Sequence, residues 1–265
     1  MTLPTAQPSI QGAPLEADDL ADFATIDPAD IASAVQWWDE NASADFVGAL
    51  DGDGSIAFER GQWMNTATGL AIAATVLHAE MRKHQEATFR VLDGLTAQLY
   101  AGGITLEQWQ IATAAELKDA HLAQAIFGAG GVDNLDTVAQ GRVAETLVKE
   151  YGYLSQFAQD IVDEDVSEAQ AIARSHQYGN STQQNYWREF VLVGLILFGA
   201  SSLLGATPPA PAKIIWTLHP AEHCPDCLSL AAGSPYTAAT LPTYPGAGGT
   251  QCRANCKCSL EPDLG

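Results

Sequence analysis

The residues of this chain best suited to chemistry are its five cysteines, all of which lie beyond residue 223. Cys224 and Cys227 occur in the stretch HCPDCLSL, and the stretch TQCRANCKCSL holds Cys252, Cys256 and Cys258. Two cysteines separated by two residues can reach the same tetrahedral ion from a tight turn. The spacing therefore predicts a zinc site in which four of the five cysteines are ligands.

Because zinc takes four ligands, one of the five cysteines is not needed for the site. The expected ligands are Cys224, Cys227, Cys256 and one of Cys252 or Cys258. A histidine is the other option for one position, and His223 and His219 lie nearby in the sequence. A closed site of this kind is structural, because it leaves no position for a reacting water. Free or partly disulfide-bonded thiols are the alternative.

The charge and the opening residues restrict the class of protein. The chain has 32 acidic and 12 basic residues and a formal net charge of −20, with no concentrated basic segment. Such a chain is repelled by bare nucleic acid, so we expect no sequence-specific nucleic-acid partner.

The first residues lack the basic and apolar regions of a secretory signal, and five cysteines cannot all pair. We expect a reducing compartment, in which thiols bind metal.

The pattern along the chain predicts a mainly α fold in three parts. Residues 1–19, rich in Pro, Ala and acidic residues, are expected to form a flexible leader. Residues 20–206 are expected to form an α-helical body. Residues 207–265, here called the C-terminal module, are expected to be small, loop-rich and held together by zinc, with short β-strands.

Capping residues and apolar periodicity indicate where the helices of the body begin. The expected caps are Asp27 or Asp30, then Thr105 with Gln108, Asn134 or Asp136, and Ser167 with Gln170. Residues 62–93 form a long helical run that we expect Gly94 to end. No strand is expected in this part of the chain. An amphipathic helix is predicted from the spacing of Val143, Leu147, Tyr151, Leu154 and Ile161.

Residues 190–206 form the most apolar stretch and carry no charge. Seventeen residues are at the short limit of what spans a bilayer. We expect a helix buried in the body or between subunits, with membrane contact as the alternative. The residues expected to make these apolar contacts are Phe190, Leu192, Leu195, Ile196, Leu197 and Phe198.

The C-terminal residues resemble a known family. The sequence IIWTLHPAEHCPDCLSLA, followed by TLPTYPGAGGTQCRANCKCSLEP, is similar to the C-terminal signature of phage minor head proteins, the Mu F-like head morphogenesis family. The shared features are Trp216, the C-P-x-C motif at 224–227, the Pro/Gly-rich spacer at 245–249 and the N-C-x-C motif at 255–258. Many relatives have a histidine near the position of Cys252, which leaves the fourth ligand open.

The resemblance implies a structural protein of a tailed-phage virion, inside the head near the portal vertex. It would assist head assembly and genome retention or ejection, after assembly in the host cytoplasm. Expected partners are the portal protein, the major capsid protein, or further copies of the chain. Two other functions stay open: a membrane-active DNA-ejection protein that uses residues 190–206, and a metal-dependent enzyme.

Overall fold

A computed structural model of the chain describes residues 10–59, 62–163, 166–194, 213–219 and 221–263, and it is mainly helical. The helices of the body are α1 (Ala17–Ala21), α2 (Pro28–Asn41), α3 (Ala74–Tyr100), α4 (Leu106–Ala129), α5 (Thr137–Asp163), α6 (Glu168–Ser181) and α7 (Gln183–Glu189). Short 3₁₀ turns occur at Asp22–Ala24, Val132–Asn134 and Arg253–Asn255. The strands are β1 (Ile56–Glu59), β2 (Gln62–Asn65), β3 (Leu70–Ala71), β4 (Lys213–Thr217) and β5 (Ser259–Asp263), and α9 (Pro225–Ala232) completes the C-terminal module.

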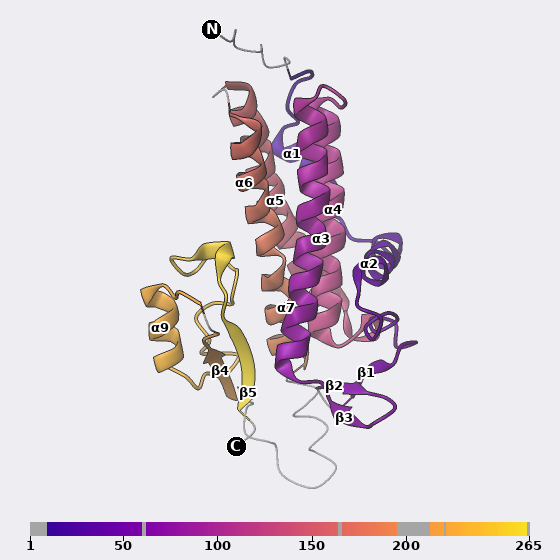
Figure 1. Cartoon of the computed structure of the whole chain (residues 1–265), viewed down its shortest axis with the longest axis vertical. Coiled ribbons are helices and arrows are strands. Elements are labelled where there is room, and N and C mark those ends of the chain that lie inside the picture. The colour runs from indigo at the N-terminus through magenta and orange to yellow at the C-terminus, as the bar shows by residue number, and fades with distance from the viewer. Residues whose placement is uncertain (1–9, 60–61, 164–165, 195–212, 220, 264–265) are drawn as a thin grey trace, which may run out of the picture.

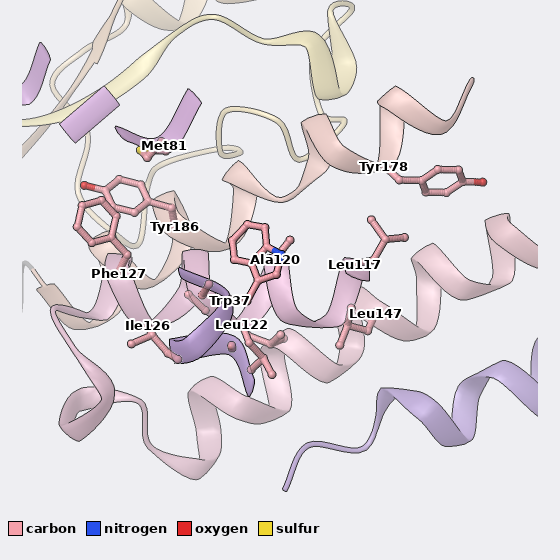
Figure 2. Packing of buried hydrophobic residues seen from close by; sticks show 14 of the residues in the cluster. Trp37, Met81, Leu117, Ala120, Leu122, Ile126, Phe127, Leu147, Tyr178 and Tyr186 are labelled. Carbon is pink, nitrogen blue, oxygen red and sulfur yellow. The ribbon is translucent and has the colours of Figure 1, made fainter. Parts of the chain in front are cut away.

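Helix α4 lies at the centre of the body. The helices α3, α4, α5 and α6 run side by side along the long axis, and α2 lies against the outer side of α4 (Figure 1). Every residue from Ala120 to Ala129 is buried, because α2, α3, α5 and α7 all contact this helix. Figure 2 shows Phe127 beside Tyr186 of α7, with ring centroids 5.2 Å apart. A Cβ atom on Gly128 would lie 2.2 Å from the Tyr186 carbonyl oxygen, so the approach of α7 to α4 requires glycine there.

The predicted helix starts are confirmed. The Asp27 carboxylate accepts hydrogen bonds from the N–H groups of Ala29 and Asp30 at the start of α2. Reciprocal capping boxes begin two more helices, Thr105 with Gln108 at α4 and Ser167 with Gln170 at α6. Each box satisfies backbone N–H groups that the first helical turn leaves unpaired.

A β-hairpin replaces the start of the long helix predicted for residues 62–93. Strand β2 pairs antiparallel with β1 and β3, so the expectation of no strand in this region is wrong. Trp63 explains the change, since its ring stacks on Phe127 at 4.8 Å and its Nε1 donates to the Phe127 carbonyl oxygen. These contacts stabilise the strand at Trp63 and outweigh the local preference of the segment for helix. Gly94 does not end the helix either: α3 continues to Tyr100, and the position of Gly94 is open and exposed.

The flexible leader expected over residues 1–19 is packed from residue 10 onward, and residues 1–9 lie outside the described ranges. The Leu15 N–H donates to the buried Gln110 side chain at 2.7 Å, and Gln110 donates back to the Leu15 carbonyl oxygen at 3.2 Å. Leu20 of α1 is fully buried. The buried Gln110 amide thus pairs with the backbone at Leu15, and Leu20 packs against the helices of the body.

The described part of the apolar stretch is short. Residues Phe190–Gly194 continue α7 as a π-helix, in which Val191 is buried and the Phe190 ring lies parallel to Tyr186. Leu192 is partly exposed, whereas Leu195, Ile196, Leu197 and Phe198 lie outside the described residues. Within the described ranges, no helix combines the length and the apolar character needed to cross a membrane.

The C-terminal module has the small, loop-rich form expected from its sequence. Strands β4 and β5 form an antiparallel pair in which Trp216 is opposite Leu260. Ile214 and Trp216 are buried, and α9 contacts β4. The module lies beside α6 and α7 (Figure 1).

The Glu116 carboxyl in α4 makes the stability of the body depend on pH. Trp37 Nε1 donates to both of its oxygens, at 3.2 and 3.3 Å, but burial raises the pKa of Glu116 from 4.5 to about 7. The folded state therefore favours the protonated form, and this group lowers the free energy of unfolding as the pH rises from 4.5 to about 7.

Glu116→Gln should remove this contribution, so the variant should gain melting temperature relative to the unsubstituted chain at pH 8 but not at pH 4.5. Thermal melts at the two pH values check the expectation. The matched control is Glu86→Gln, which changes an exposed carboxylate on α3. An equal gain for both variants would contradict the assignment to burial.

Candidate metal centre

The five cysteines lie at the ends of short elements of the C-terminal module. Cys224 is the N-cap residue of α9, and Cys227 lies in its first turn, three residues later. Residues three apart on a helix lie on the same face, so the C-P-x-C motif is the first turn of a helix rather than an isolated turn. Cys252 and Cys256 flank the turn Arg253–Asn255, and Cys258 directly precedes β5.

The sulfur atoms converge on Cys227. Its Sγ lies 3.5 Å from Cys224 Sγ, 3.5 Å from Cys252 Sγ and 3.7 Å from Cys256 Sγ. With zinc–sulfur bonds of about 2.3 Å, neighbouring sulfurs in a tetrahedral site lie about 3.8 Å apart. The spacing thus matches a thiolate site, and the cluster could hold a metal ion.

Two sets of three sulfurs meet the spacing of a metal site. One set is Cys224, Cys227 and Cys252, and the other is Cys227, Cys256 and Cys258. The sequence expectation combined Cys224, Cys227 and Cys256 with one further thiol. The structure brings all five cysteines together, and Cys227 is the member common to both sets.

His223, the alternative ligand expected from the sequence, lies beside Cys258 but belongs to neither set of sulfurs. Its Nε2 lies 2.6 Å from the His219 carbonyl oxygen, to which it donates, so Nδ1 carries the free lone pair. That Nδ1 lies 3.7 Å from Cys258 Sγ. His219 has a different role, because its Nε2 bonds to Ser259 Oγ at 2.8 Å and its ring packs edge-on against His78.

Two thiols of the cluster have a lowered pKa, Cys224 and Cys256. Burial acts to raise the pKa of Cys224, but hydrogen bonds from the backbone of Cys227 and Cys252 outweigh it. A hydrogen bond from the Cys258 thiol lowers the pKa of Cys256 to about 5. The same pairing raises the pKa of Cys258, and burial raises the pKa values of Cys227 and Cys252. A bound cation would have to displace the protons of these thiols, so metal binding should release protons and weaken as the pH falls.

The helical body holds the second cysteine loop in place. Gln183 Nε2, at the start of α7, donates to the carbonyl oxygens of Ala254 and Cys256 at 3.2 and 3.1 Å. Asn180 Nδ2, near the end of α6, donates to Asn255 Oδ1 at 2.8 Å. Sequence reasoning missed both amides, because their only signal is polarity within a helical stretch.

Comparison of the chain with protein-family models, curated proteins and solved structures finds no match. The chemical role of the site is therefore inferred from the geometry of the cysteine cluster and its contacts with the body.

Single Cys→Ser substitutions should separate the ligands from the spare thiol. Cys227→Ser should remove most of the bound metal, because Cys227 belongs to both sets of sulfurs. We expect one substitution among Cys252→Ser and Cys258→Ser to leave the metal content near that of the unsubstituted chain. Elemental analysis of each purified variant gives the readout, and full metal content in Cys227→Ser would refute the site.

Proposed function

We propose that this chain is a structural, non-catalytic minor head protein of a tailed bacteriophage, whose C-terminal module is held together by one zinc ion. The observation that carries the structural role of zinc is the convergence of five thiols around Cys227, in a module that accepts hydrogen bonds from Gln183 and Asn180 of the body.

Zinc suits this set of ligands. Thiolates select soft or borderline cations, and four thiolates form the closed tetrahedral site typical of structural zinc. The loop between α9 and β5 needs such support, since residues 233–250 consist mostly of Gly, Pro, Ser, Thr and Ala. Segments with so little apolar surface gain much of their stability from a bound metal.

The assignment to a phage head is supported by the resemblance of the C-terminal residues to the Mu F-like family. The net charge of −20 supports a position beside packaged DNA without adhesion to it, because both molecules are anionic. In this proposal the protein lies inside the head near the portal vertex, where the portal protein, the major capsid protein or further copies of the chain are its partners.

Removal of zinc should unfold the C-terminal module and leave the helical body folded. Most of the buried core lies in the body around α4, whereas the described residues of the module add to it only Ile214, Trp216, Leu260 and three cysteines of the thiol cluster. Hydrogen exchange measured by mass spectrometry, with and without a strong chelator, should show loss of protection in β4, α9 and β5 only. Cys227→Ser should reproduce this pattern without chelator. Unchanged protection throughout the module after complete zinc removal would refute the structural role of the metal.

Head assembly provides the test of the biological role. In a phage that encodes this chain, mass spectrometry of purified particles should find the protein at low copy number in heads that lack tails as well as in complete virions. A nonsense mutation in its gene should reduce the yield of DNA-filled heads, and expression of the unsubstituted chain should restore it. Absence of the protein from all particles, together with normal head yield, would exclude the proposal.

A further inference from the structure

A polar hollow lies between the body and the C-terminal module, and the described residues of its lining include no cysteine, although Arg253 and Ala254 directly follow Cys252. It has a volume of about 580 Å³ and is lined by α5, α6, α7 and the loop that precedes β5. Its basic residues are Lys149, Arg174, Arg188 and Arg253. Four of the chain's 12 basic residues thus line one concave surface of a protein that has 32 acidic residues.

The basic side chains are not all neutralised by carboxylates. Arg174 forms an ion pair with Asp160, and Arg188 pairs with the buried Glu189. For Lys149 and Arg253, the structure shows no ion pair with any residue that it describes. These two exposed cations come from different parts of the fold, Lys149 from α5 and Arg253 from the loop of the module.

Glu150 is the acidic residue in the lining, and burial reduces its charge. Its side chain is 9% exposed, and burial raises its pKa from 4.5 to about 7. At neutral pH a large fraction of this carboxyl is therefore protonated and can donate a hydrogen bond. The net charge of the hollow is positive, which is the reverse of the charge of the whole chain.

The wall contributed by the module has an unusual backbone. Gly246 and Gly248 have φ angles of 82° and 79°, and a Cβ atom on Gly246 would lie 2.6 Å from Gln183 Cγ. Arg253 also has a positive φ, 49°, which is uncommon for a residue with a side chain. Glycine adopts a positive φ without strain, whereas for the exposed Arg253 it is strained, and such strain tends to occur at functional sites.

We propose that this hollow binds the phosphate group of a small ligand, with Lys149 and Arg253 as its two principal contacts. Phosphate offers several acceptor oxygens and a double negative charge, which suit a lysine and an arginine that line the same hollow. Ser181 and Gln184 also line the hollow and add polar groups. The volume exceeds that of inorganic phosphate alone and lies within the range of small-molecule sites. This inference does not depend on the proposed role in the phage head.

Isothermal titration of the full-length, metal-loaded protein with pyrophosphate tests the proposal. Lys149→Ala and Arg253→Gly should each weaken binding about tenfold or more, because each removes a charge-assisted hydrogen bond. Glycine adopts the positive φ at position 253 without strain, so Arg253→Gly should remain folded. The control is Arg90→Ala, which removes an exposed cation of α3 outside the hollow and should bind as the unsubstituted chain does. Undetectable binding at millimolar pyrophosphate, or equal affinity in all variants, would overturn the proposal.

Two further titrations identify the source of the phosphate. A mononucleotide that binds with the same dependence on Lys149 and Arg253 would support a small phosphorylated ligand. A short single-stranded DNA that binds with this dependence, in place of the mononucleotide, would show that the hollow takes phosphates of a nucleic-acid backbone and would overturn the small-ligand assignment.

Discussion

The convergence of sulfur atoms on Cys227 is the contact on which the C-terminal module depends. The chain on either side of β4 and β5 consists of loops, and the described strands pair over only five residues each. A thiol cluster brings α9 to the turn Arg253–Asn255, which is distant in sequence. That turn then receives the hydrogen bonds of Gln183 and Asn180 from the body. The order of the cluster and the docking of the module are therefore linked through two backbone carbonyls and the side chain of Asn255.

Much of the helical body could be predicted from local sequence. Thr105 and Ser167 begin helices because their hydroxyls satisfy N–H groups three residues later, and this chemistry requires no knowledge of the fold. The hairpin could not be found in this way. Trp63 is in a strand because its ring stacks on Phe127, which lies in a helix more than sixty residues later, and only the packed structure brings the two together.

The candidate site likewise has residues that the sequence identifies and residues that only the fold identifies. The cysteine spacing identifies the thiols, because two cysteines one helical turn apart can share an ion wherever the motif occurs. The choice among Cys252, Cys256 and Cys258 depends on the path of the loop, which the sequence does not specify. Gln183, Asn180 and Arg253 are functional candidates only once α6 and α7 lie against that loop. Their roles come from position in space rather than from residue type.

The complete burial of the second half of α4 has a consequence for how this protein can change during evolution. A single-residue insertion in an α-helix rotates all later side chains by about 100° around the axis. On a helix that has one solvent-exposed face, such a rotation moves some side chains between exposed and half-buried positions. Between Ala120 and Ala129 every face contacts a neighbouring helix, so an insertion would move bulky side chains into places occupied by alanine or glycine. Length variation among homologues should therefore fall in the loops that flank α4 and not within it.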